Sequence, residues 1–251
     1  MDAQEDNKEV LLSIITVTWN NLEGLKKTAN SINTQTARNQ IQWVVIDGKS
    51  NDGSVEFIKQ HTSANDYWVS EKDRGLYDAM NKGLKAAKGT FLWFLNAGDV
   101  VFADNIVQLL NPYFANADLI FGETMLTLPD GSNIGTRSEH TTRKLPQHLT
   151  LQSMLGGMIV NHQSVIVKKS YCPEFDLTWK IAADYDWLCT ILEQDIKTKN
   201  SWLVHSGFEL GGLSSKKKWA SWKERFRIMK KHFGLLKTLK AHITIVFRAV
   251  L

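Results

Sequence analysis

The sequence has few of the features that cross-link a chain, anchor it in a membrane or divide it into domains. Its 251 residues include two cysteines, Cys172 and Cys189, which fit neither a disulfide framework nor a metal–thiolate site and indicate a reducing compartment. No apolar run approaches the roughly 20 residues of a membrane-spanning helix. The acidic first seven residues lack the apolar core of a secretory signal. We therefore expect a cytoplasmic protein without a transmembrane anchor.

Internal repeats and linkers rich in proline or serine are also absent, which favours a single domain. With 43% hydrophobic and 22% charged residues, the composition is that of an ordinary globular protein. A chain of this length buries roughly three quarters of the surface that its unfolded form exposes. It therefore needs no staples to fold.

What the sequence does have is an uneven distribution of charge. Residues 216–251 contain 11 of the 30 lysines and arginines and a single acid, Glu224, so this segment carries +10. The other 215 residues carry a net charge of −6. We interpret the chain as an acidic body over 1–215 followed by a basic C-terminal extension over 216–251.

The first hundred residues alternate between strand and helix patterns. Apolar runs rich in β-branched and aromatic residues, as in buried parallel strands, occupy 10–17, 43–46, 67–69 and 91–95. Helical spacing of apolar residues is found at 22–35 and 76–87, and a short helix is expected near 54–60. Such alternation predicts an α/β fold in which helices flank a mostly parallel sheet.

The second half is less regular. The pattern predicts a hairpin around a turn at 129–131, a polar loop over 135–157, a strand over 163–167 and a helix over 183–192. In the tail, apolar residues recur every three or four positions between lysines and arginines: Trp219, Trp222, Phe226, Met229 and Phe233. This spacing predicts a basic amphipathic helix over 217–235.

Polar residues follow the predicted strands at one edge of the sheet, where ligands bind in open α/β folds. They are Thr18, Asn20, Asp47, Asp52 and Asp99. Asp52 fits a turn or a helix cap. Asp99 differs because it follows an apolar strand and a flexible Ala-Gly pair that lets the backbone approach a bulky polyanion. It is therefore the candidate ligand of a metal–diphosphate complex.

Four segments together resemble a known family. "SIITVTWN" (13–20), "VIDGKSNDGS" (45–54), "SEKDRGLYDAMNKGL" (70–84) and "FLNAGD" (94–99) are similar, in order and spacing, to the inverting family 2 glycosyltransferases with the GT-A fold. The similarity is greatest to the group that builds bacterial exopolysaccharides such as colanic acid. It implies a Rossmann-like nucleotide-binding half over 1–100 and an acceptor half over 101–215. The expected reaction moves a sugar from a nucleotide-sugar to a saccharide acceptor that is often lipid-linked.

The resemblance also implies roles for individual residues. Donor contacts fall to Val17, Thr18, Asn20, Asp47, Asp73, Arg74, Asn96 and Asp99. The usual Asp-x-Asp-Asp run is "NAGD" (96–99) here, so Asp99 would hold the divalent metal, Mn²⁺ or Mg²⁺, with Asn96 or water beside it. Gly48 stands where many relatives carry the acid that reads uracil, which leaves the donor base open.

The resemblance makes Asp184, in "ADYDW" (183–187), the catalytic base. A carboxylate is needed because an acceptor hydroxyl is a poor nucleophile at neutral pH. Asp186 competes for the role, but acids at i and i+2 of a helix diverge by about 200°, so only one faces the sugar. The resemblance favours Asp184, and Asp186 would be a cap or a solvated acid.

His162 and His205 are the candidate contacts to the acceptor or the diphosphate. His162 precedes a strand, where a histidine with purely structural partners is an equal alternative. His205 is expected to end a strand and to begin "HSGFELGGLS" (205–214), which resembles the loop that folds over the diphosphate. The lysine run over 216–218 would add positive charge.

The basic tail has three competing interpretations. It can lie on an anionic membrane surface, dock on the body or contact a second subunit. The lipid-linked acceptors of the resembling family favour the membrane, on the inner face of which we expect a peripheral protein. Nucleic acid is disfavoured because nothing outside the tail is basic or base-stacking in pattern.

Two other functions fit parts of the sequence. A sugar nucleotidyltransferase needs a glycine-rich, basic loop after the first strand, where this chain has "TWNN" (18–21). A catalytically degenerate scaffold that binds sugar or nucleotide fits the thinned metal motif. Slow hydrolysis of a nucleotide-sugar would distinguish an enzyme from such a scaffold.

Overall fold

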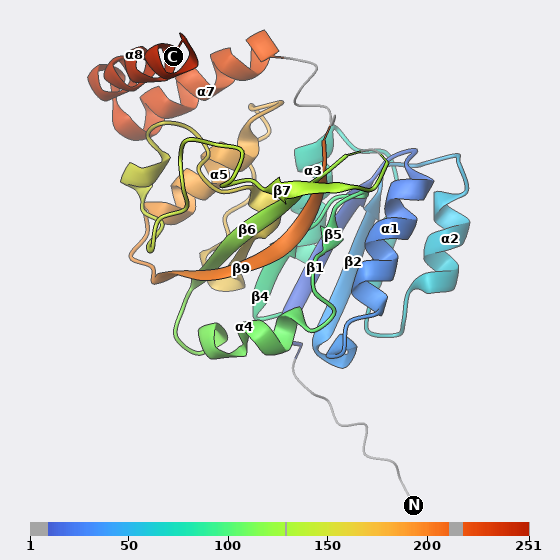
Figure 1. Ribbon diagram of the computed structural model, residues 1–251. Coiled ribbons are helices and arrows are strands. Elements are labelled where there is room, and N and C mark those ends of the chain that lie inside the picture. The colour runs from blue at the N-terminus through green and yellow to red at the C-terminus, as the bar shows by residue number, and fades with distance from the viewer. Residues whose placement is uncertain (1–9, 129, 211–217, 251) are drawn as a thin grey trace, which may run out of the picture.

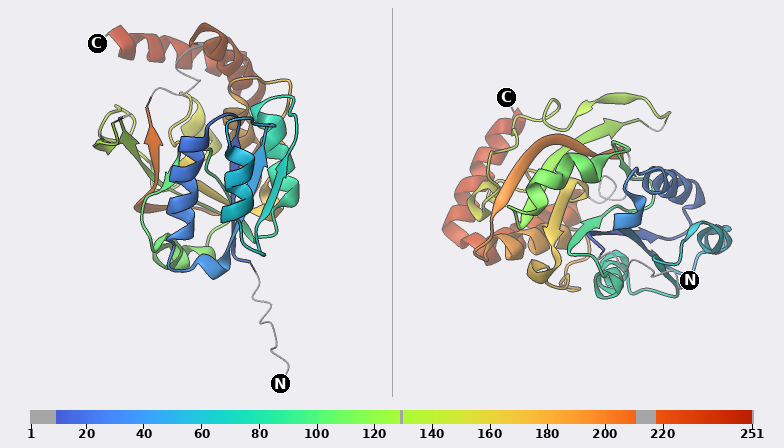
Figure 2. Two further views of the ribbon diagram at one scale, coloured as in Figure 1. Left: turned by 90° about the vertical axis from the view of Figure 1, so that its right-hand side faces the viewer. Right: turned by 90° about the horizontal axis from the view of Figure 1, so that it is seen from below.

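Within residues 10–128, 130–210 and 218–250, which the computed structural model describes, a nine-stranded sheet carries helices on both faces (Figures 1 and 2). The strands are β1 Leu12–Thr18, β2 Ile41–Asp47, β3 Tyr67–Ser70, β4 Phe91–Phe94, β5 Val100–Val101, β6 Leu119–Thr127, β7 Asn133–Thr136, β8 Val165–Lys168 and β9 Thr198–Glu209. The α-helices are α1 Leu22–Asn33, α2 Ser54–His61, α3 Leu76–Ala86, α4 Ile106–Phe114, α5 Ala183–Leu192, α7 Lys218–Phe233 and α8 Leu235–Val250. Short 3-10 turns include η2 Leu151–Met154 and η3 His162–Ser164.

The strand order β3-β2-β1-β4-β8-β6-β9-β5 brings the predicted site segments to one edge. β3, β2, β1 and β4 are parallel neighbours, and Thr18, Asp47 and Ser70 lie level at their carboxyl ends. β8 is antiparallel to both β4 and β6. The long β9 pairs with β6 from Thr198 to Glu209, and the short β5 pairs with it at Ser206 and Gly207. This arrangement confirms the predicted α/β fold.

Each face of the sheet has its own apolar core. Alternating residues of β1 point to opposite faces, as strand geometry requires: Ile14 packs with α1, α2 and α4, and Ile15 packs with α3, α5 and the end of α7. α3 approaches β1 closely because a Cβ at Gly83 would lie 2.3 Å from the side chain of Ile15. The tight packing of α3 fixes the loop before it, which carries part of the predicted site.

Most predicted elements lie within two or three residues of the observed ones, and two boundaries differ. The predicted hairpin is present as β6 and β7, but the strand over 163–167 begins only at Val165, because the preceding residues form η3. The strand expected to end at His205 continues to Glu209. Its extension is stabilised by pairing with Val100 and Val101 of β5 and with the end of β6.

The tail forms two helices that stand beside α5 (Figure 1). Ile228 and Met229 of α7 are buried against the body, and the ring of His242 on α8 lies against Trp222 and Phe226 of α7. The predicted amphipathic helix is therefore present and docked along part of its length. The boundary predicted at residue 215 lies outside the described residues. Among the described helices, none is long and apolar enough to cross a membrane.

Candidate active site

The loops after β1 and β2 are fastened to one another. Asn20 adopts a left-handed backbone conformation (φ 48°), its N–H donates to Ser50 Oγ at 2.7 Å, and its side-chain oxygen accepts from Asn51 N at 2.9 Å. The fully buried Asp47 carboxylate accepts from Ser50 N at 3.0 Å and from Ser70 Oγ at 2.5 Å. Asp47 therefore holds the ends of β2 and β3 and the intervening loop in register.

Asp52 has the structural role that the sequence allowed. Its carboxylate accepts from Leu22 N at 2.8 Å, at the start of α1, and from Ser54 N at 3.1 Å, at the start of α2. A carboxylate at two helix N-termini satisfies backbone donors that have no partner within the helix. Asp52 thus fixes the position of both helices behind the site.

Asp73 and Gly48 lie together below the exposed ring of Trp19. Burial raises the pKa of Asp73, although its carboxylate accepts from Lys82 Nζ at 2.5 Å. A Cβ at Gly48 would lie 3.2 Å from Asp73 Oδ2 and 3.3 Å from Trp19. An acidic side chain at position 48 would be crowded against the Asp73 carboxylate. Glycine at this position therefore leaves room for Asp73.

Arg74 is turned away from this group. Its guanidinium donates to Asp78 Oδ1 at 2.7 Å, and its side chain is 78% exposed. Asp78 also accepts from Arg74 N at 3.0 Å, which closes the turn before α3. The structure thus brings Asp73 to the strand edge and leaves the Arg74 side chain in solvent.

The loop that carries Asp99 is held by α1. Thr28 Oγ1 donates to Asp99 O at 2.6 Å and accepts from Gly98 N at 3.0 Å, and Asn21 Nδ2 donates to Ala97 O at 3.0 Å. Gly98 has φ 109°, a conformation that glycine adopts readily. The Asp99 side chain is buried, and burial raises its pKa to about 6.

Three buried polar atoms around this loop have no hydrogen-bond partner among the described residues. They are Thr18 Oγ1, Asn96 Oδ1 and His162 Nε2. Buried polar atoms are nearly always bonded, so an unpartnered group calls for an explanation such as a bound ion or ligand. Thr18 ends β1 beside Val17, whose side chain belongs to the core.

The described residues contain no cluster of three or more histidines, cysteines and acids that would hold a metal by themselves. The Asp99 carboxylate and the free amide oxygen of Asn96 are nevertheless hard oxygen donors of the kind that Mg²⁺ and Mn²⁺ accept. Two such ligands suffice where phosphate oxygens and water complete the coordination. These two residues therefore fit a metal shared with a diphosphate.

Asp184 lies in the first turn of α5 with three polar groups around it. Its carboxylate is 3.2 Å from His162 Nδ1, 3.3 Å from Tyr77 Oη and 3.0 Å from Tyr185 N. Burial alone would raise the pKa of Asp184, but the hydrogen bond and charge of His162 outweigh it and hold that pKa below its ordinary value. With 22% of its side chain exposed, Asp184 is an ionised carboxylate that solvent or a ligand can reach.

His162 lies between the two acids of the site. Burial would lower its pKa, but Asp184 and, at longer range, Asp99 raise it. The turn that carries His162 is fixed to the core because Trp93 Nε1 donates to Gln163 O at 2.7 Å. His162 Nδ1 contacts Asp184, and its Nε2 is the unpartnered atom described above. His162 is thus bonded to Asp184 through one nitrogen and lies close enough to Asp99 for the two charges to interact.

His205 does not join the site, which corrects the expectation from the sequence. It lies inside β9 and is fully buried, with Nε2 at 2.7 Å from Ser201 Oγ and Nδ1 at 3.0 Å from Ser164 O. Burial lowers the pKa of His205 to about 4, so the ring is neutral. A neutral ring with both nitrogens bonded cannot supply charge to a phosphate. Residues 211–217, which include the last four residues of the predicted diphosphate loop and two lysines of the run after it, lie outside the described residues.

Asp186 is not the cap or solvated acid that we expected. It is buried, and its carboxylate accepts from Lys231 Nζ at 2.8 Å and from His232 Nε2 at 2.8 Å, both on α7. Burial would raise the pKa of Asp186, but His232 and Lys231 outweigh it and lower that pKa. Asp186 therefore joins α5 to the tail and faces away from Asp184.

Sequence reasoning missed two residues at the site. Tyr77, whose hydroxyl contacts both Asp184 and Ile181 O, lies within the quoted "GLYDAMNKG" segment, but nothing in the spacing links it to residue 184. Glu224 accepts from the backbone just before α5. Its sequence signal was its isolation, as the single acid in a basic tail.

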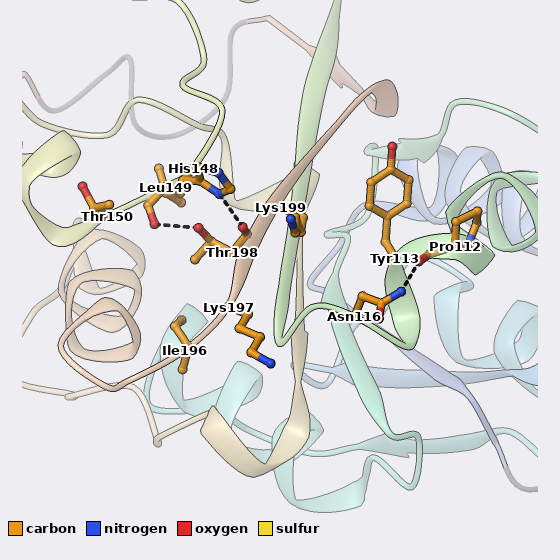
Figure 3. Close-up of a pocket in the computed structure, with 10 residues that line it drawn as sticks. All are labelled: Pro112, Tyr113, Asn116, His148, Leu149, Thr150, Ile196, Lys197, Thr198 and Lys199. Carbon is orange, nitrogen blue, oxygen red and sulfur yellow. Dashed lines mark hydrogen bonds between the residues drawn. The ribbon is translucent and has the colours of Figure 1, made fainter.

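A hollow near the start of β9 is remote from these residues (Figure 3). Tyr113, His148, Lys197 and Lys199 are among the residues that line it. Within the hollow, His148 Nδ1 lies 3.1 Å from the backbone oxygen of Thr198. None of the predicted site residues lines this hollow, so it is not the site described above.

The fold and the site are those of an α/β protein with acidic residues and an ionised carboxylate at the carboxyl edge of its sheet. Transferases of the GT-A type belong to this class. Comparison with known proteins specifies the family. The profile of glycosyl transferase family 2 matches residues 13–170. The chain therefore belongs to glycosyl transferase family 2, and its function is that of a glycosyltransferase.

Relatives with curated names agree with this assignment. An uncharacterized glycosyltransferase of Mycobacterium tuberculosis is 30% identical over 181 residues, which are 70% of this chain and 67% of the relative. A PGL/p-HBAD biosynthesis glycosyltransferase of Mycobacterium bovis is 23% identical over 216 residues, or 82% of this chain and 79% of the relative. The resemblance to the colanic acid group stays a prediction.

Solved structures share the fold. TarS 1-349 of S. aureus matches with a TM-score of 0.62 at 16% identity, covering 93% of this chain and 72% of TarS 1-349. The mannosyltransferase PcManGT of Pyrobaculum calidifontis, in complex with GDP-Man and Mn²⁺, matches with a TM-score of 0.59 at 17% identity, covering 88% and 62%. At these identities the likeness demonstrates the GT-A fold.

Proposed function

We propose that the chain transfers a sugar from a nucleotide-sugar to a hydroxyl of a saccharide acceptor, with inversion at the anomeric carbon. One observation carries the proposal: an accessible, ionised Asp184 contacts His162, whose Nε2 is one of the buried atoms around the Asp99 loop that have no partner among the described residues. A base and an anion-binding edge at such close quarters suit displacement of a diphosphate by a hydroxyl.

Asp184 acts as the base in this proposal. Its carboxylate accepts the proton of the acceptor hydroxyl as that oxygen attacks, and a single displacement inverts the stereochemistry. His162 and Tyr77 orient the carboxylate, and His162 keeps it ionised. A divalent metal at Asp99 and Asn96 would stabilise the negative charge of the leaving diphosphate.

The donor is proposed to be a nucleoside diphosphate sugar. Solved structures with this fold include TarS 1-349 of S. aureus in complex with UDP-GlcNAc and the PcManGT complex with GDP-Man and Mn²⁺, which supports both the donor class and the metal. Thr18, Asn20 and Asp73 near the ends of β1 to β3 are the proposed nucleoside contacts, and the buried Asp47 holds the loops that carry them. Gly48 leaves the choice of base to experiment.

The acceptor is proposed to be lipid-linked, and the protein peripheral on the cytoplasmic face of a membrane, within bacterial surface polysaccharide biosynthesis. The support is the tail. Trp219 on α7 is 81% exposed, and Leu236 and Ile243 on α8 are 77% and 58% exposed. Exposed apolar side chains among lysines and arginines match an anionic lipid surface.

A donor screen tests the proposal. The protein is titrated with UDP-, GDP- and dTDP-sugars, with and without Mn²⁺ or Mg²⁺, and melting temperature and nucleotide release are followed. We expect one nucleotide class to raise the melting temperature only with metal and to be hydrolysed slowly. Binding without release of nucleoside diphosphate, even with saccharide acceptors added, would favour the scaffold interpretation. Absence of both would overturn the proposal.

A further inference from the structure

The segment just before the first turn of α5, which carries Asp184, is bonded to a different helix. The residue before the helix, Ala182, has no side-chain cap of its own. Three consecutive N–H groups point at the Glu224 carboxylate on α7 instead: Lys180 N lies 2.9 Å from Oε1, and Ile181 N and Ala182 N lie 2.8 and 3.0 Å from Oε2. One carboxylate therefore fixes the backbone that leads into Asp184.

α3 holds the same segment from the opposite side. Tyr77 Oη donates to Ile181 O at 2.8 Å and lies 3.3 Å from Asp184 Oδ1. The N–H of Ile181 is bonded to Glu224 and its carbonyl to Tyr77, so this residue is fixed at both of its backbone groups. A displacement of Glu224 or of Tyr77 would therefore shift the Asp184 carboxylate.

α7 is itself anchored firmly enough to serve as a support. Lys231 and His232 bond Asp186 two turns further along α7, and Ile228, four residues after Glu224, is fully buried. The position of Glu224 is thus set by the docking of α7. Three backbone donors suit a carboxylate because it only accepts, and its negative charge is favourable at a helix N-terminus.

We propose that Glu224 is a positioning residue for the base: by capping residues 180–182 it sets the orientation of the first turn of α5 and hence of the Asp184 carboxylate. The inference rests on the proposed role of Asp184. The tail helix α7 is then part of the catalytic machinery. Misplacing a reacting group by about 1 Å costs roughly 100-fold in rate, so a loosened cap acts on turnover.

The test is Glu224→Gln, which keeps the size of the side chain but exchanges one acceptor oxygen for an NH₂ group. With the donor that the screen selects, we expect kcat to fall roughly 10- to 100-fold and the KM and Kd of the donor to stay unchanged. Glu193→Gln is the matched control, because it makes the same acid-to-amide change at another residue that joins α5 to α7, bonded to His232 at 2.7 Å, without touching Glu224. It should leave kcat within about twofold.

Amide hydrogen exchange gives a second measurement that needs no substrate. Glu224→Gln should speed exchange at residues 180–186 and leave β1 to β3 unchanged. If Glu224→Gln does not fold, Glu224→Asp carries the test, because it keeps the charge and withdraws it by one methylene. Unchanged kcat in a folded Glu224 variant would overturn the inference. If Asp184→Asn retains full turnover, the base assignment is wrong instead, so the two failures are distinguishable.

Discussion

Two regions of the molecule surround their acids in opposite ways. At the strand edge around Asp99 and Asp184, buried polar atoms of neighbouring residues have no partner among the described residues, and Asp184 is open to solvent. At the junction of α5 with α7, each oxygen of Asp186 and of Glu224 accepts at least one hydrogen bond. The first region has polar atoms that a ligand can bind, whereas the acids of the second region are fully hydrogen-bonded within the fold.

The difference separates acids that composition cannot tell apart. Asp184 and Asp186 lie two residues apart in α5, and their pKa values are both lowered against the effect of burial. Asp184 is held by a histidine and a tyrosine of the body, and Asp186 by a lysine and a histidine of the tail. The Asp184 side chain is partly exposed to solvent, whereas that of Asp186 is buried. Substituting each acid in turn tests this distinction, because one substitution should lower activity and the other stability.

The largest effect is expected when the two acids are neutralised one at a time. Asp184→Asn should lower turnover by about 10²- to 10⁴-fold, the usual contribution of a general base, with donor affinity unchanged. Asp186→Asn should leave turnover within a few-fold. It leaves Lys231 and His232 without their counter-charge and should lower the free energy of unfolding by about 1–3 kcal/mol. Turnover assays and thermal unfolding measure both variants.

Equal loss of turnover in the two variants would contradict the comparison, because it would make the tail junction as catalytic as the strand edge. Loss of donor binding in Asp184→Asn would contradict its role as base. For a chain of this size, 1 kcal/mol corresponds to about 2–4 °C in melting temperature. The expected drop for Asp186→Asn is therefore easily measured.

Two asparagines with buried side-chain oxygens sharpen the same comparison. The side-chain oxygen of Asn96 has no partner among the described residues, whereas Asn81 bonds Phe175 O at 2.9 Å and Phe175 N at 2.7 Å. Asn96→Ala should weaken donor binding in the presence of Mn²⁺ about tenfold, or about 1.4 kcal/mol, with little change in melting temperature. Asn81→Ala should do the reverse, because it leaves two buried backbone groups unsatisfied.

Calorimetric titration with nucleoside diphosphate and Mn²⁺, together with thermal unfolding, checks this pair. If Asn96→Ala destabilised the fold as much as Asn81→Ala, the free oxygen of Asn96 would be a structural group. If Asn96→Ala bound the donor like the wild type, the proposed metal site would be reduced to Asp99 alone.

The sequence predicted the strand edge well because its signals are local. Strand runs and turn residues place Thr18, Asp47 and Asp99 at carboxyl ends, and parallel register brings such ends level. The position of Asp184 came from the family resemblance, because nothing in the spacing around it indicates which strand ends it meets. Its partner Tyr77 is 107 residues away in the chain.

The errors arose where long-range packing decides. His205 looked like the last residue of a strand, but β5, only two residues long, extends β9 by pairing with it. Asp186 looked solvated, because its partners Lys231 and His232 belong to a tail whose docking on α5 leaves no local pattern.

The third prediction concerns the ionisation of the base. His162 donates to Asp184 and lowers its pKa against the effect of burial. His162→Gln keeps a side-chain donor but removes the positive charge, so the pKa of Asp184 should rise. The acid limb of the profile of kcat against pH should therefore move to higher pH, with a smaller loss of turnover above it. An unmoved limb would show that another group sets it.

The smallest effect is expected at the tail junction, where His232 has a 1% exposed side chain between Asp186 and Glu193. Burial would lower the pKa of His232, but these two acids raise it above its ordinary value of 6.5. A raised pKa in the folded state contributes stability that is fully present below about pH 6.5 and is lost as pH rises through the folded-state pKa. The lowered pKa of Asp186 contributes stability above about pH 3.8, which is lost only in stronger acid.

The junction should therefore be most stable between these limits, and His232→Gln should remove the alkaline part of the dependence. At pH 6 the variant should melt about 2–4 °C below the wild type, which corresponds to about 1 kcal/mol. At pH 9 the two curves should converge, because the wild-type imidazole is then neutral. Thermal unfolding from pH 5 to 9 measures this difference. A gap that stayed constant with pH would mean that His232 contributes packing alone, and that the charge pairing of α7 to α5 is carried by Lys231.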